Sequence, residues 1–246
     1  MTTSRTARML AGPALWVLGQ AALVATGIFV YFRVRGLTEG SEDVAVRHAR
    51  DIAELEGDLG IHIEPSVQSP VETSEVAETL ANWIYIWGHW PVIIVTMTWL
   101  AWQHRDVFLR LRNGMLVSGG IGLVIFATYP VAPPRLAQLG LVDTVTRSSD
   151  SYRVLQPPAF VNQYAAMPSL HYGWDLLVGI AIVTAATTTW LRVVGWLLPV
   201  AMAWAVVATA NHFVLDVLAG ALLALVGHAA ALGLERVRLG RSGTVP

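Results

Sequence analysis

The chain has 246 residues, of which 54% are hydrophobic and 13% are charged. Soluble globular proteins carry about 25% charged residues, so this chain has too little charge to cover the surface of a soluble domain. All 16 basic residues are arginine and the net charge is -1, which excludes the basic surface that nucleic acid requires. Cysteine is absent, which excludes disulfides, zinc–thiolate sites and cysteine nucleophiles. We therefore expect an integral membrane protein with one domain over residues 1–246.

Six segments are predicted to cross the bilayer, which takes about 20 apolar residues each. In chain order they are residues 13–32, 80–102, 111–129, 170–190, 193–209 and 212–234. The apolar run of the first is longer than a signal-peptide core, so we expect it to be retained. The predicted fold class is all-α, an integral membrane bundle of six transmembrane helices.

Residues 33–79 form an acidic insert between the first and second predicted spans. Its largely apolar positions recur in steps of three and four residues, at Val44, His48, Ile52, Leu55 and Leu59. This spacing predicts an amphipathic helix that lies on the membrane surface or on the bundle, or else forms a lid over an active site. Ser69, Pro70 and Glu72 predict a second helix start that leads into the second span.

Three polar residues fall on one side of the membrane along this six-span path. Arg135 follows the third span, His171 opens the fourth and His212 opens the sixth. Ionisable residues at membrane depth are costly and mark functional sites. We therefore expect these residues to converge at one end of the bundle.

His212 and Asp216 are four residues apart, which places them on one face of a helix. A hydrogen bond to Asp216 would fix the tautomer of His212 and leave the other ring nitrogen as a nucleophile or base. The alternative is a buried pair that only ties helices together.

The fourth span begins with a second group of candidates. Ser169 is predicted to cap this span, whose N-terminus attracts an anion, and His171 lies in the first turn. Asp175 follows His171 by four residues and either orients it or faces a water-filled cavity. Ordinary capping with an interfacial histidine is the alternative.

Arg135 follows a run of prolines that ends the third span and stiffens the loop. Its guanidinium matches phosphate oxygens, although it could also bind bulk lipid headgroups. A nucleophile, a proton donor and a cationic donor are the groups that phosphoryl transfer needs. A metal site held by two histidines and one or two aspartates is the competing interpretation.

The ordered motifs Pro133-Pro134-Arg135, Pro168-Ser169-Leu170-His171 and His212-x-x-x-Asp216 resemble the type 2 phosphatidic acid phosphatase superfamily. The most similar branch contains inositol phosphorylceramide synthase and sphingomyelin synthase. The resemblance implies that His212 takes the phosphoryl group as a phosphohistidine and that Asp216 orients it. It implies that His171 protonates the leaving oxygen and then activates the acceptor. Arg135 would match a phosphate-binding arginine, with no metal and no other cofactor. The helix start capped by Ser169 is expected to bind the phosphate as well.

Two basic residues that the main phosphatase branch carries are missing from this chain. That branch has a lysine seven residues before the motif arginine, where this chain has Thr128. It also has a Ser-Arg pair where this chain has Ala205 and Val206. The lipid phosphotransferase branch lacks the same cations, which favours that branch. Arg147 and Arg153 are candidates to replace them.

The leading hypothesis is a lipid phosphate phosphatase or lipid headgroup phosphotransferase that acts on a lipid phosphate or diphosphate in the bilayer. Nine of the 16 arginines fall on the side of the N-terminus, which favours cytoplasmic termini. With the resemblance, this predicts a bacterial plasma membrane protein whose active site faces the extracytoplasmic side. The alternative is a six-span transporter or lipid-binding protein without catalysis, although polar residues near one face argue against it.

Overall fold

The computed structural model describes residues 15–30, 33, 41–148 and 162–242. Helices make up most of these residues, as the all-α prediction requires. The extended pairing found among them is a single parallel bridge between Val131 and Ala165. A helix over Leu15–Val30 comes first. It is followed by α2 (Glu42–Asp58), α3 (Glu64–Thr73), α4 (Glu75–Trp87), α5 (Trp90–Gln103), α6 (Arg105–Thr128), the 3-10 turn η1 (Pro134–Leu136), α7 (Thr144–Ser148), α9 (Leu170–Ala185), α10 (Thr189–Ala208) and α11 (Val214–Ser242).

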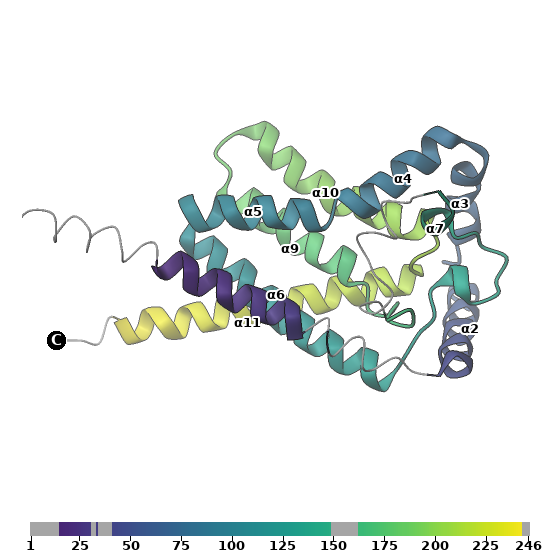
Figure 1. The fold of residues 1–246 in the computed structure, drawn as a ribbon, viewed down its shortest axis with the longest axis horizontal. Helices are drawn as coiled ribbons and strands as arrows, with labels where there is room; N and C mark the ends of the chain where they lie inside the picture. Colours follow the sequence, from purple (N-terminus) through teal and green to yellow (C-terminus); the bar gives the residue numbers. More distant parts are fainter. Residues whose placement is uncertain (1–14, 31–32, 34–40, 149–161, 243–246) are drawn as a thin grey trace, which may run out of the picture.

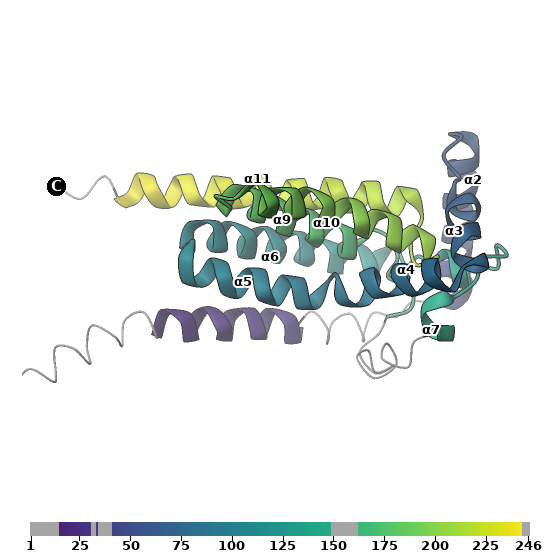
Figure 2. The ribbon, with the colours of Figure 1, turned by 90° about the horizontal axis from the view of Figure 1, so that it is seen from above.

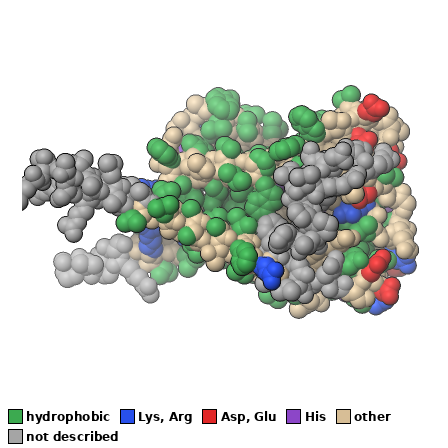
Figure 3. Space-filling view, viewed as in Figure 1, with side chains coloured by type: hydrophobic (Ala, Val, Ile, Leu, Met, Phe, Trp, Pro, Cys, Tyr) green, Lys and Arg blue, Asp and Glu red, His purple; other side chains and the backbone are tan. Residues whose placement is uncertain are grey.

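Three of the described helices, α6, α10 and α11, are long and apolar enough to cross a membrane. The pair α4 and α5 makes a fourth if it is counted as one span with a bend of 43°. The helix over Leu15–Val30 and α9 are apolar but shorter. The six predicted spans overlap these six helical units, but by length and composition the described residues supply three candidate spans, or four with the bent pair, and not six. Figure 3 shows hydrophobic side chains gathered over the middle of the molecule.

The second predicted span is broken, and its start differs from the prediction. Ser74 caps α4, its side chain accepting a hydrogen bond from the backbone N–H of Ala77. The start predicted at Ser69 is wrong, because α3 has already begun at Glu64 and holds Pro70 in its interior. The chain bends after Trp87, and α5 begins at Trp90 with a proline in its first turn. The break places His89 between the two helices.

α9 lies at the centre of the bundle and packs against α6, α10 and α11. Most of its side chains are buried, among them Trp174, Leu177 and Val178. α9 has only 16 residues, which is short for a membrane span. It is stabilised by the neighbouring helices, because protein rather than lipid covers most of its surface. The indole N–H of Trp174 donates to the hydroxyl of Ser118 on α6 across 3.2 Å. A short apolar helix is therefore well enclosed by its neighbours.

α2 stands across one end of the bundle, and the C-terminal end of α11 lies at the opposite end (Figures 1 and 2). The face of α2 that is buried consists of Ala45, Val46, Ala49, Ile52 and Glu56. The predicted stripe is therefore wrong at Leu55 and Leu59, whose side chains are about half exposed. Small residues face the bundle because the loop after α6 approaches closely, with the N–H of Ala132 donating to the carbonyl of Ala45.

Candidate active site

His212 lies in the turn between α10 and α11, two residues before Val214, the first residue of α11. The backbone N–H groups of Asn211 and His212 both donate to the carbonyl of Val206, which folds the turn back onto the end of α10. The prediction that His212 and Asp216 lie on one face of the same helix is therefore wrong, because His212 lies before the helix that contains Asp216. The two side chains nevertheless meet, because Asp216 lies in the first turn of α11 and its Oδ2 is 3.4 Å from Nδ1 of His212.

A backbone carbonyl holds the imidazole of His212. Its Nδ1 lies 2.8 Å from the carbonyl oxygen of Ala166. A carbonyl can only accept, so Nδ1 carries the proton, and in the neutral ring Nε2 keeps its lone pair. The side chain of His212 is almost completely buried. The lone pair of Nε2 can act as a base or a nucleophile, and the tautomer is selected by Ala166, which sequence reasoning missed.

Ala166 is itself fixed by a short chain of loop contacts. The N–H of Ala166 donates to the carbonyl of Val131, and the N–H of Val131 donates to the carbonyl of Tyr164. The loop that contains Val131 also bonds to α2 through Ala132 and Ala45. α2 and two loops therefore determine where His212 points, although they contribute no side chain to it.

Three buried carboxylates cap the N-terminus of α11. Asp216 Oδ2 accepts from the N–H of Phe213 across 2.9 Å. Glu64 Oε1 accepts from the N–H of Val214 across 2.9 Å, and Glu56 Oε1 accepts from that of Leu215 across 2.7 Å. A helix N-terminus favours negative charge and leaves its first N–H groups unpaired, so these acids satisfy groups that the helix cannot.

Burial and the neighbouring Glu64 raise the pKa of Glu56 to about 8, against the lowering effect of the hydrogen bond from Leu215. Sequence reasoning missed both glutamates as parts of the site. One signal was present, since Glu56 follows the buried Ile52 by four residues and so occupies the core-facing side of α2. An acid at that position requires a buried partner.

His171 lies in the first turn of α9, beside three other rings. Its ring centroid is 6.1 Å from that of His212, 4.7 Å from that of Tyr85 and 4.4 Å from that of His89. Ser169 caps α9 as predicted, its hydroxyl accepting from the N–H of Tyr172. The structure therefore brings the two predicted histidines together at one end of the bundle.

Asp175 is paired with His89. Its Oδ1 lies 2.9 Å from Nδ1 of His89, and both side chains are buried. Of the two roles expected for Asp175, orientation of His171 is indirect in the structure, since Asp175 contacts His89 and the ring of His89 lies against His171. Sequence reasoning missed His89, although it is an ionisable residue within a predicted span.

Arg135 lies in η1 and reaches the turn that carries His212. Its Nε donates to Oδ1 of Asn211 across 3.0 Å, and its Nη1 donates to Oδ2 of Asp143 across 3.2 Å. Its backbone N–H donates to the carbonyl of Ala210. The structure therefore places Arg135 beside the residue that precedes His212. The side chain of Arg147 and all of Arg153 lie outside the described residues.

A family model of the PAP2 superfamily matches residues 50–230, from within α2 to within α11. The chain belongs to the PAP2 superfamily. No curated protein and no solved structure matches the chain in the corresponding comparisons. PAP2 superfamily members are in general phosphoesterases or phosphotransferases, so membership supports an enzyme that acts on phosphate esters at a membrane.

Proposed function

We propose that the protein is a lipid phosphate phosphatase or lipid headgroup phosphotransferase that works through a phosphohistidine on His212, without a metal ion. The observation that carries the proposal is the bond from Nδ1 of His212 to the carbonyl of Ala166, which leaves Nε2 as the nucleophilic nitrogen. The nearby ring of His171 supplies a second titratable group.

The proposed reaction has two steps. Nε2 of His212 attacks phosphorus, the bond from phosphorus to the leaving oxygen breaks, and His171 gives its proton to that oxygen. His171 then takes a proton from water or from an alcohol, whose oxygen attacks the phosphohistidine and releases His212. Arg135 binds the phosphate oxygens, and Ser169 orders the start of α9 next to them. Asp216 stabilises the positive charge that develops on His212.

We infer a transferase of the branch that contains inositol phosphorylceramide synthase and sphingomyelin synthase in preference to a hydrolase. The supporting observation is the pair of missing cations, at Thr128 and at Ala205 and Val206, since the lipid phosphotransferase branch lacks them too. The same proposal places six spans in a bacterial plasma membrane, with the site on the extracytoplasmic side.

The test is turnover by detergent-purified protein of a panel of lipid phosphates and diphosphates, with and without inositol and other alcohols, in EDTA. We expect phosphate release or a new phospholipid, and a labelled phosphoenzyme that is stable to base and labile to acid. His212→Ala should abolish both, while His104→Ala, a histidine at the other end of the bundle, should retain them. A pure transporter or lipid-binding protein would bind the lipids and turn over none.

A further inference from the structure

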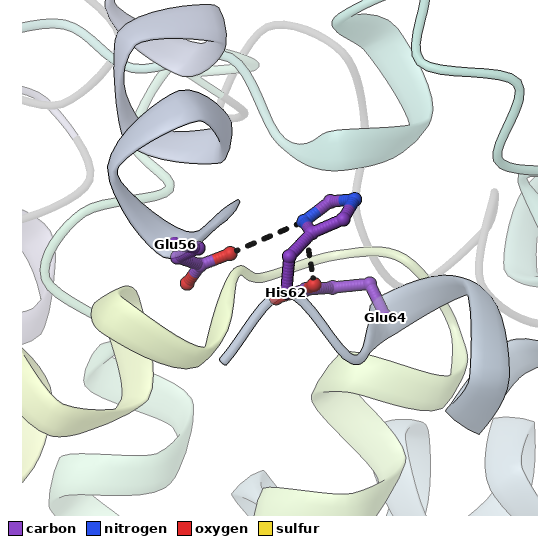
Figure 4. Close-up of side chains that lie close together, drawn as sticks. All are labelled: Glu56, His62 and Glu64. Atoms are coloured by element: carbon purple, nitrogen blue, oxygen red, sulfur yellow. Dashed lines mark ion pairs between the residues drawn. The ribbon is translucent and has the colours of Figure 1, made fainter. Parts of the chain in front are cut away.

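The acids that cap α11 leave a second group of donor atoms outside the proposed catalytic centre. Glu56, His62 and Glu64 each offer one ligand atom, and these atoms lie within 4.8 Å of one another, with both carboxylates facing the imidazole of His62 (Figure 4). Glu56 ends the buried face of α2, Glu64 begins α3, and His62 lies in the connection between these helices. Three donors from consecutive parts of the chain therefore meet at the outer end of the bundle.

The two carboxylate oxygens of each glutamate face different groups. The Oε1 atoms accept hydrogen bonds from the N–H groups of Leu215 and Val214. The Oε2 atoms are fully buried, and the groups near them in the described part of the chain are the imidazole of His62 and the carboxyl of the other glutamate. Two buried acidic oxygens that face each other are costly unless a proton or a cation lies between them, and the arrangement is therefore suited to a cation.

His62 alone cannot provide a hydrogen bond to both Oε2 atoms. Its Nδ1 is 3.0 Å from Oε2 of Glu64 and 3.7 Å from Oε2 of Glu56. A single N–H on Nδ1 points toward one oxygen at a time, and the other oxygen stays unpaired.

The spacing fits a small divalent cation. Zinc bonds to histidine nitrogen and carboxylate oxygen at about 2.0–2.2 Å, so two ligands of one tetrahedral ion lie roughly 3.4 Å apart. The separations of His62 Nδ1 from the two Oε2 atoms, 3.0 and 3.7 Å, fall on either side of that value, and the third separation is at most 4.8 Å. His62 is about one-third exposed, which gives an ion access from solvent and leaves room for a water as the fourth ligand.

We propose that Glu56, His62 and Glu64 form a structural site for a divalent transition-metal ion of the zinc class, separate from the phosphate-transfer chemistry. One imidazole with two carboxylates favours zinc over magnesium, which prefers an all-oxygen octahedral shell. The ion joins α2 to α3 and holds the carboxylates that cap α11. It thereby secures the helix start that follows His212.

The test uses the full-length protein in detergent, with its affinity tag removed and its metals stripped by chelator. Zinc is titrated by calorimetry and by thermal unfolding, and cobalt is titrated by visible absorption. We expect one zinc per chain, a raised unfolding temperature and tetrahedral cobalt bands, whereas magnesium at the same concentration has no effect. His62→Ala should weaken zinc binding at least 100-fold, and His104→Ala should leave it unchanged.

Glu64→Gln provides a second variant, since its amide oxygen still accepts from the N–H of Val214 while the charge is lost. It should fold and also lose zinc affinity. Absence of zinc binding by the wild-type protein, or equal affinity in His62→Ala, would overturn the proposal and leave His62 as an ion-pair partner only. None of these measurements uses turnover, so their outcome is independent of the proposed phosphotransfer.

Discussion

His212 has two acceptors near the same ring nitrogen, and they differ in distance and in charge. The carbonyl of Ala166 is 2.8 Å from Nδ1, whereas Oδ2 of Asp216 is 3.4 Å from it and already accepts from the N–H of Phe213. The carbonyl therefore selects the tautomer, and in the proposed mechanism the carboxylate acts on the charge of the ring. This division of roles differs from a triad, in which one carboxylate does both.

The first prediction follows from that division. Asp216→Asn should lower kcat by roughly 10- to 100-fold, less than the ~10⁴-fold loss seen when a triad carboxylate becomes an amide. The asparagine oxygen can still cap Phe213 and the Ala166 carbonyl still fixes the tautomer, so only the charge is lost. Steady-state kinetics should show an unchanged KM. A loss near 10⁴-fold would instead assign the tautomer to Asp216.

The second prediction concerns His89 and Asp175, which we infer to position His171. Asp175→Asn and His89→Ala should each reduce kcat by about tenfold, and the double variant should be no worse than the single ones, because the two residues act as one unit. The pH profile of kcat should shift in both variants, since the ring beside His171 has changed. Additive losses, or losses without a shifted profile, would contradict the positioning role.

At the scale of elements, the site depends on how closely α9 approaches α11. The N–H of Ser169 donates to the carbonyl of Asp216 across 2.9 Å, which ties the start of α9 to that of α11. One turn further along α11, a Cβ on Gly220 would overlap the carbonyl oxygen of Ser169. Glycine at 220 is therefore what lets the helix that carries His171 lie against the helix that follows His212.

The third prediction tests this crossing. Gly220→Ala should separate the two helix starts, lower the unfolding temperature and reduce turnover at least tenfold, because backbone atoms cannot yield as a side chain can. Gly233→Ala is the matched control on the same helix, where an added Cβ meets nothing within 4 Å. It should keep activity and gain up to about 1 kcal/mol from helix propensity. Equal behaviour of the two variants would refute the close-contact argument.

Apolar run length predicted the positions of the helices well, because it reports directly on burial in lipid or protein. It failed at the starts of α4 and α11, where the side chains of Ser74 and Asp216 cap the helices through contacts that periodicity does not encode. The order of the spans predicted that His171 and His212 would lie at one end of the bundle, and their ring centroids are 6.1 Å apart. The partners of the site, among them His89 and Glu64, were missed because they are brought in by tertiary packing from segments without a motif.

At the scale of the whole molecule, the two ends of the bundle differ in composition. The end with α2 and α3 carries acidic side chains, as Figure 3 shows, and it also holds the proposed site. The opposite end is held by the ion pair of Arg110 with Glu235, whose atoms approach to 2.9 Å. The chain runs between the two ends along α4–α5, α6 and α9 (Figure 1).

The last prediction uses the absence of cysteine, which makes single-cysteine reporters unambiguous. Asp58→Cys lies at the exposed end of α2 beside the proposed site, and Thr187→Cys lies in the exposed connection between α9 and α10 at the opposite end. Three proposed crossings, α4–α5, α6 and α9, separate the two positions, so they should face opposite sides of the membrane. In intact cells, a membrane-impermeant maleimide should label the Asp58→Cys variant and spare the Thr187→Cys variant, and permeabilised cells should label both.

This pattern would place the site outside, as the proposed topology requires. Labelling of both variants in intact cells would mean that the bent pair or α9 fails to cross, and labelling of the Thr187→Cys variant alone would invert the orientation that the arginine distribution favours.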